Sequence, residues 1–267
     1  MDELIKRLKL EKSLEKRLLE LIKADEEKIT IIAEKCKENG FSHLKKENEL
    51  MRLAVCIKYA EYTKEEYERL DISEKIFFDT MSDIAIWCEN NENRGLKNYN
   101  WIKNHLKAEL FKIGRLQFQL YPCKNKTLNY SKMPFKYGEN LIYIHIPQGE
   151  KLIYADCVAS IKAANDFFAH YFPEYEYTYY FSESWLLFGE NYLFMQSSSN
   201  ILQFQSLFEI VDSLPIDAQA IERIFGKRRL FKRNYPENTS LQKSARAFML
   251  DGGRMGIGIG VIDKNEL

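Results

Sequence analysis

Two titratable side chains stand in segments that otherwise have the composition of buried strands, and both types can carry a proton. His145 lies in LIYIHIP, and an imidazole titrates near neutral pH, which suits the removal of a proton from an amine. Glu183 lies in FSESW, where an unpaired carboxylate is costly to bury. The alternatives are a hydrogen-bonded core histidine and a glutamate that marks a strand end. Both residues are therefore candidates for a general base.

The elements that position these residues change type near residue 114. Before it, apolar residues recur every three or four positions, which predicts a helical domain over residues 1–113. Gly40 is expected to end one helix, and Thr63 with Glu66 has the spacing of a capping box that begins another. Gly114 is expected to end the last helix.

After Gly114 the period changes to two, in RLQFQL, which predicts a strand with one polar face. Arg115, Gln117 and Gln119 share that face. They are expected to line a polar pocket for an acceptor, unless the face simply meets solvent. This change of period predicts a domain boundary at Gly114, so the second domain is expected to contain residues 114–267.

Within this second domain, two strands flank a helix. The strand that contains His145 precedes a helix that Asp156 is expected to cap, and the strand that contains Glu183 follows it. Strands joined in this way should be parallel, with a right-handed connection. Further helices are expected near 199–206, 217–225 and 240–250, with strands at 208–213 and 256–262. In the last strand, alternating glycines indicate close approach of another group to one face.

Composition limits which partners the whole chain favours. The 39 basic and 39 acidic side chains cancel, so the overall charge points to neither a nucleic-acid partner nor an anionic membrane. No apolar run reaches the roughly 20 residues of a membrane span. Five scattered cysteines without metal-ligand spacing indicate reduced thiols, no metal and a cytoplasmic location. The run GKRRLFKR (226–233) has the chemistry to meet phosphates of a cofactor or RNA, although a solvated loop is the commoner role of such a run.

The order of elements resembles the catalytic half of a GNAT-type N-acyltransferase. The phrases IGRLQFQ, IHIPQGEKL, ASIKAANDFFAHYFPE, SWLL, SSNILQF and TSLQKSA are similar to those of bacterial acyltransferases with a helical N-terminal domain and a GNAT-like C-terminal domain. The resemblance covers essentially the whole chain. It implies an α+β protein, with a helical domain followed by a mixed α/β domain around a central, partly parallel twisted sheet.

The resemblance also implies acyl-coenzyme A as co-substrate and an amine of unknown identity as acceptor. Catalysis is expected from His145 or Glu183 as base and from Tyr192 as proton donor to the thiolate, although a tyrosine there is more often simple packing. Trp185 is expected to join the polar strand in binding the acceptor. Coenzyme A is expected between the strand that ends at Pro147 and the strand through Ser184, with these contacts: Ile146, Gln148, Gly149, Cys157, Val158, Ser184 and Asn200.

One departure from the family pattern keeps a second hypothesis open. The usual phosphate loop, (Q/R)-x-x-G-x-(G/A), is replaced by IPQGEKLIYADCVAS, in which Glu150 and Asp156 would repel a phosphate that both faced. The alternative is a non-catalytic GNAT-like module that binds a small ligand or a protein partner. Cys157, at the first turn of a helix, is a conceivable thiol nucleophile, but a small buried apolar side chain is the commoner role.

Overall fold

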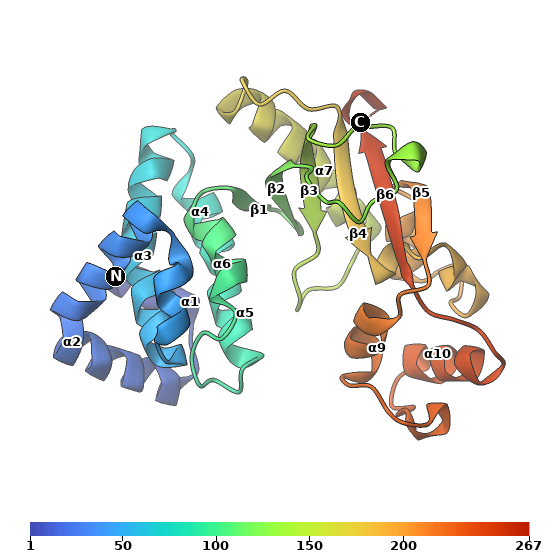
Figure 1. Ribbon diagram of the computed structural model, residues 1–267, viewed down its shortest axis with the longest axis horizontal. Coiled ribbons are helices and arrows are strands. Elements are labelled where there is room, and N and C mark those ends of the chain that lie inside the picture. Colours follow the sequence, from blue (N-terminus) through green and yellow to red (C-terminus); the bar gives the residue numbers. More distant parts are fainter. Residues whose placement is uncertain (267) are drawn as a thin grey trace. The chain divides into compact units, whose positions relative to one another are not determined.

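The computed structural model describes residues 1–266, so the last residue of the expected second domain, Leu267, lies outside the described part. The chain forms two compact units (Figure 1). The first contains residues 1–113 together with 117–119 and 146–148. The second contains the remaining described residues.

The first unit is helical, as the spacing of its apolar residues predicts. Its helices bury apolar residues at this spacing, among them Leu14 and Leu18 of α2 and Ile102 and Leu106 of α6. Helix α2 ends at Asn39, before a glycine with φ of +79°, as expected. The helices are α1 (Asp2–Leu8), α2 (Lys12–Asn39), α3 (Glu49–Arg69), α4 (Glu74–Met81), α5 (Asp83–Glu89) and α6 (Tyr99–Leu106).

Two expected boundaries in this region are wrong. Thr63 lies inside α3 and is buried, and its hydroxyl donates to the Leu106 carbonyl at 2.6 Å, so it joins α3 to α6 instead of capping a helix. The last helix ends at Leu106, not at Gly114. Strand β1 (Leu110–Ile113) follows, and Gly114, with φ of +64°, forms the turn into β2 (Leu116–Pro122).

The second unit is built on a mixed sheet. Strands β3 (Asn140–His145) and β4 (Tyr179–Ser184) are parallel and are joined by α7 (Tyr154–Tyr171), which confirms the predicted crossover. Along the sheet the order is β2-β3-β4-β6-β5, and β6 (Ile257–Asp263) pairs antiparallel with both β4 and β5 (Glu209–Leu214). Helix α7 begins at Tyr154, so Asp156 lies in its first turn and is not its N-cap.

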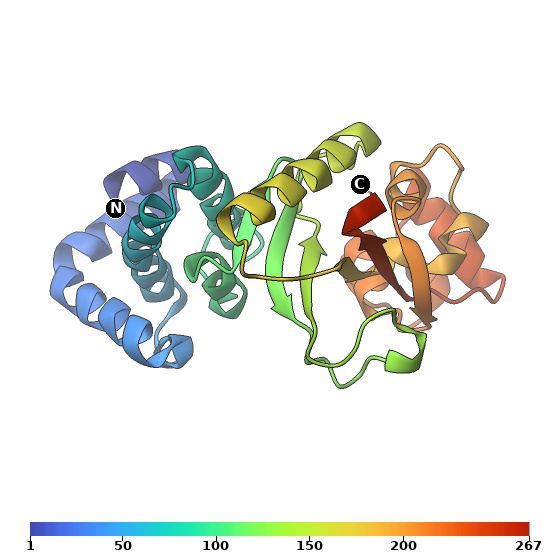
Figure 2. The same cartoon turned by 90° about the horizontal axis from the view of Figure 1, so that it is seen from above.

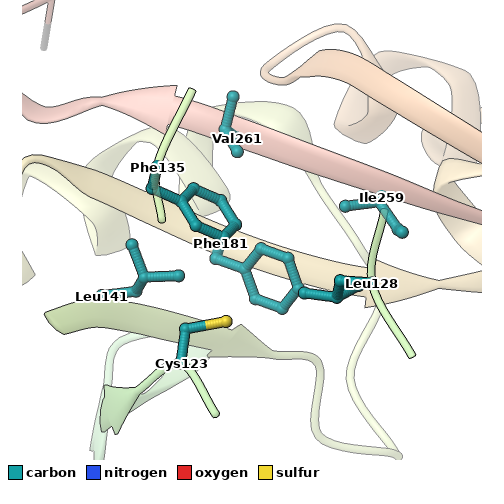
Figure 3. Packing of buried hydrophobic residues seen from close by; sticks show 7 residues of the cluster. All are labelled: Cys123, Leu128, Phe135, Leu141, Phe181, Ile259 and Val261. Carbon is teal, nitrogen blue, oxygen red and sulfur yellow. The ribbon is translucent and has the colours of Figure 1, made fainter. Parts of the chain in front are cut away.

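The two faces of this sheet are covered differently (Figure 2). Helix α7 lies on one face, where the Tyr180 hydroxyl is 3.5 Å from the Asn165 side chain. The segment 123–139 lies on the other, where Phe181 is part of a buried apolar cluster (Figure 3). Its fully or nearly buried members are Cys123, Leu128, Phe135, Leu141, Phe181, Ile259 and Val261. The face opposite α7 is therefore largely aromatic and aliphatic.

Short helices follow β4 and β5. They are η3 (Trp185–Leu187), η4 (Gly189–Leu193), α8 (Asn200–Gln205), α9 (Ala218–Phe225) and α10 (Ser240–Leu250). Among the described residues, none of the helices combines the length and apolar composition that crossing a membrane requires.

The glycines of β6 allow η3 to approach the strand closely, as the alternating pattern predicts. A Cβ on Gly258 would lie 1.8 Å from the Leu187 carbonyl oxygen, so the backbone would have to move. We expect Gly258→Ala to lower the free energy of unfolding by about 3 kcal/mol in urea denaturation. Gly189→Ala is the control, because its added methyl meets only the Ser213 hydroxyl, at 3.1 Å. Equal losses in the two variants would contradict the backbone contact.

Candidate active site

The main-chain pairing between β3 and β4 gives way to side-chain hydrogen bonds at their carboxyl ends. Backbone partners include Tyr143 with Phe181. One residue further, the Ile144 carbonyl accepts from the Ser182 hydroxyl at 2.9 Å, and the Glu183 carbonyl accepts from the Tyr143 hydroxyl at 3.2 Å. Hydroxyl groups thus satisfy backbone acceptors that a neighbouring strand would otherwise pair. An extended ligand chain can replace such bonds.

Glu183 is the candidate base with the clearest physical support. Its side chain is half-buried, and burial raises the pKa of its carboxyl above the usual range. It has neither an ion-pair nor a hydrogen-bond partner for this carboxylate within residues 1–266. The Tyr121 and Tyr143 rings lie near enough to interact electrostatically with it. A carboxylate in such surroundings holds a proton more tightly than one in water, which favours proton transfer near neutral pH.

His145 is stacked on its neighbour along β3. The Tyr143 and His145 rings are parallel within 3°, with centroids 4.1 Å apart, so these two residues share a face of the strand. Phe181 of β4 also contacts Tyr143, edge to face at 5.0 Å. Because Phe181 and Glu183 alternate with Ser182 along β4, Glu183 lies on this same face. His145 and Glu183 are thus brought to one face and one end of the parallel pair.

Arg115 lies beneath the segment that leads into α7, and it is only 6% exposed. Its guanidinium donates to the carbonyls of Glu150 at 2.8 Å and Lys151 at 3.0 Å. Burial lowers the pKa of this guanidinium, which nevertheless stays charged. Its Nη1 atom is buried without a hydrogen-bond partner in the described part of the chain. A buried cation with an unused donor suits an anion.

The amino end of α7 adds backbone donors near this cation. Ile153 precedes the helix and provides no side-chain cap, so the first-turn N–H groups are available to a ligand. An 18-residue helix also places partial positive charge at this end. The side chains of Glu150 and Asp156 are exposed, and both lie close enough to Arg115 to interact with its charge. Arg115 thus offsets part of the acidic character that the sequence places here.

Cys157 is buried in the first turn of α7, and burial raises the pKa of its thiol to about 11. Desolvation outweighs the nearby Arg115 charge, which alone would lower this pKa. A thiol with this pKa is protonated near neutral pH. The structure therefore favours packing over nucleophilic chemistry for this side chain.

The other predicted acceptor-binding residues are mostly buried. Gln117, in the first unit, lies 3.4 Å from His105 Nε2, and His105 is 3.2 Å from the Asp83 carboxylate. Gln119 is half-buried. Trp185 is buried, and its backbone N–H donates to the Gln219 side chain at 2.7 Å.

The remaining predicted residues fall into local structural roles or on the surface. Ser184 caps η3 by accepting from the Leu186 N–H at 3.2 Å. Gln148, in the first unit, accepts from Asn90 at 3.2 Å. Tyr192, on η4, is 65% exposed. Gly149 and Asn200 are exposed, while Ile146 and Val158 are half-buried.

Sequence reasoning missed Ser182, which supplies a side-chain hydroxyl at the end of β4. Ser182 stands between Phe181 and Glu183 in a predicted strand, and this alternation was the available signal. It also missed Asn191, whose buried amide donates to the carbonyls of Trp185 and Leu186 at 2.9 and 3.2 Å. This amide holds η4 against η3, directly after the carboxyl end of β4.

Two open pockets lie beyond η4. One, of 620 Å³, lies between the segment after η4 and α10, and the second, of 480 Å³, lies beside it. Leu193 and Phe248 line both, and Phe248 stacks on Phe194 with centroids 5.1 Å apart. Carboxylates stand in the lining as well, Asp251 in the first pocket and Glu190 in the second. Arg254 also lines the second pocket, so both pockets combine apolar side chains with charged ones.

The helical region, the mixed sheet and the α7 crossover together define a GNAT-like acyltransferase fold. Residues 110–262 match the family model described as GNAT-like C-terminal domain, and residues 1–108 match the N-acyltransferase N-terminal domain. The chain belongs to this GNAT-like family. This confirms the resemblance and the α+β fold expected from the sequence.

Solved structures agree with this fold. An acyltransferase in complex with decanoyl-CoA and teicoplanin is 18% identical, with a TM-score of 0.79, over 98% of this chain and 87% of that one. Another, in complex with decanoyl-CoA alone, is 22% identical, with a TM-score of 0.69, over 79% of this chain and 65% of that one. Comparison with curated protein sequences found no match.

Proposed function

We propose that this protein transfers an acyl group from acyl-coenzyme A to an amine. The observation that carries the proposal is the end of the β3–β4 pair, where the carbonyls of Ile144 and Glu183 are satisfied by side-chain hydroxyls. Family membership supports it, as do the acyl-CoA ligands of the similar solved structures. Reduced, buried cysteines support a cytoplasmic setting.

The residues present fit the chemical parts of an acyl-coenzyme A. The doubly charged diphosphate suits the Arg115 guanidinium and the first-turn N–H groups of α7. The pantetheine arm suits backbone groups at the carboxyl ends of β3 and β4. A cationic cradle therefore replaces the glycine-rich loop that this sequence lacks.

In the proposed reaction Glu183 takes a proton from the acceptor ammonium, which leaves a neutral amine. The amine nitrogen bonds to the thioester carbonyl carbon, the carbon–sulfur bond breaks, and the second proton that the nitrogen loses passes to the departing sulfur to leave coenzyme A as the thiol. Glu183 suits the first step because its pKa is raised. His145, on the same face, is the second candidate base. Placing the reactants together supplies much of the rate enhancement.

A specific observation favours the alternative, a module that binds without chemistry. The Tyr143 side chain bridges from β3 to the Glu183 carbonyl on β4, so it lies across the strands that would hold the pantetheine arm. Binding of acyl-coenzyme A would require this hydrogen bond to open.

The experiment that tests the proposal is a calorimetric titration of the protein with decanoyl-CoA, acetyl-CoA and coenzyme A. We expect saturable binding, followed by release of free thiol when a panel of amines is added to the acyl-coenzyme A complex. Binding without thiol release from any amine would favour the non-catalytic module. Absence of both heat and thermal stabilisation at millimolar ligand would contradict coenzyme A as a ligand.

A further inference from the structure

The segment between α9 and η5 (Lys232–Asn234) presents large apolar side chains to solvent. Leu230 is 88% exposed, and Phe231 beside it is 52% exposed. We call residues 226–233, GKRRLFKR, the basic tip. Exposing two adjacent large apolar side chains is unfavourable in water, so a covered state would be stabilised by the hydrophobic effect.

The base of the tip is anchored. The Arg229 N–H donates to the Tyr235 hydroxyl at 3.2 Å, and the buried Tyr235 ring packs on Phe225 with centroids 4.4 Å apart. Lys232 donates to the Met249 carbonyl of α10 at 2.7 Å. These contacts fix the tip against α9 and α10, so its exposed side chains are held outward.

Five basic side chains surround the exposed pair, and two of them are already engaged. Arg228 forms a bidentate ion pair with Asp217, and Lys232 is bound to α10. Arg233 lies over the Phe231 ring at 5.4 Å. Lys227 and Arg229 have no ion-pair partner in the part of the chain that the structure describes. The tip therefore carries local positive charge in a protein with a net charge of zero.

We propose that the basic tip docks on an anionic lipid membrane surface. Leu230 and Phe231 enter the boundary between headgroups and acyl chains, while Lys227, Arg229 and Arg233 contact anionic headgroups. This partner explains both features of the tip, since a lipid surface offers apolar and anionic chemistry within a few ångströms. Nucleic acid fits less well, because Leu230 can neither stack on a base nor hydrogen-bond to one. The proposal does not depend on the acyl-transfer activity.

Vesicle co-sedimentation of the full-length protein tests this proposal. We expect binding to vesicles of phosphatidylglycerol mixed with phosphatidylcholine, weakening as salt rises, and much weaker binding to phosphatidylcholine alone. The double variant Leu230→Ser with Phe231→Ser should bind at least about tenfold more weakly. The double variant Lys227→Glu with Arg229→Glu should lose a similar amount of affinity for the anionic vesicles.

Matched controls lie on α2. Leu19 and Ile31 are exposed apolar residues there, so changing both to serine removes exposed apolar surface from the first unit and leaves the tip unchanged. Lys23→Glu with Lys35→Glu changes the net charge equally. Both control pairs should bind vesicles like the unchanged protein. Equal losses in tip and control variants would overturn the proposal.

Two further results bear on the same proposal. Phe231→Trp should show a blue-shifted fluorescence increment on anionic vesicles, which reports entry into an apolar phase even if the serine variants fold poorly. Failure to bind vesicles at low salt would overturn the proposal. So would binding of single-stranded RNA that depends on Lys227 and Arg229 but not on Leu230 and Phe231, with no vesicle binding.

Discussion

Glu183→Gln is expected to lower kcat/KM for amine acylation by about 10²- to 10⁴-fold while acyl-coenzyme A binding stays unchanged. Glutamine keeps the size and polarity of the side chain but cannot take a proton from the ammonium. Steady-state kinetics combined with calorimetric titration measures the two effects separately. Glu209→Gln, at an exposed position of β5, is the control and should leave both unchanged.

The role of Glu183 as a base also predicts how the rate of amine acylation depends on pH. The base must be ionised, and burial raises the pKa of Glu183 above its ordinary value of 4.5. Activity should therefore fall on the acid side at a pH higher than an exposed glutamate would give. The residual activity of Glu183→Gln should lack this acid limb. An unchanged limb in that variant would assign the base to another group, with His145 tested next.

As pH rises through the titration of Glu183, the free energy of unfolding should fall while the activity rises. Between the unfolded and the raised folded pKa the native state binds more protons, so stability falls as pH rises through this window. Above the window the carboxylate is ionised in both states and its desolvation opposes folding. At a pH above this window, Glu183→Gln should therefore have a higher Tm than the unchanged protein, and at a lower pH the difference should be smaller. A lower Tm of the variant at both pH values would indicate that the Glu183 side chain has only a packing role.

Arg115→Ala is expected to weaken coenzyme A binding by about 30-fold or more, because it removes a buried cation whose Nη1 is available to an anion. The effect should require the diphosphate. A pantetheine thioester, which lacks this group, should bind the variant and the unchanged protein alike. Arg223→Ala, an exposed arginine on α9, is the matched control.

The pantetheine comparison also separates charge from support of the neighbouring segment. Arg115 donates to the carbonyls of Glu150 and Lys151, so its loss also loosens the backbone before α7. If that loosening alone mattered, the affinity for the pantetheine thioester would fall in parallel with that for coenzyme A. Such a parallel loss would contradict the anion-binding role.

Local pattern was sufficient for several elements of the second unit. The parallel β3–β4 pair, the α7 crossover, the later helices and a close approach to one face of β6 follow from periodicity and chain order, whereas only the structure identifies η3 as the group that makes this approach. These features depend on neighbours in sequence or on the handedness of the connection, so they are visible without coordinates. The stacking of Tyr143 and His145 on one face follows from strand alternation in the same way.

Tertiary packing decided what pattern could not. Thr63 reads as a helix cap but bonds to Leu106 of another helix, 43 residues away in sequence. Arg115 reads as one of three polar residues on a strand face, yet packing buries it under the segment before α7. The spacing of polar and apolar residues shows which positions along an element are polar. The partner that satisfies each polar group comes from chain segments distant in sequence, and only the folded structure identifies it.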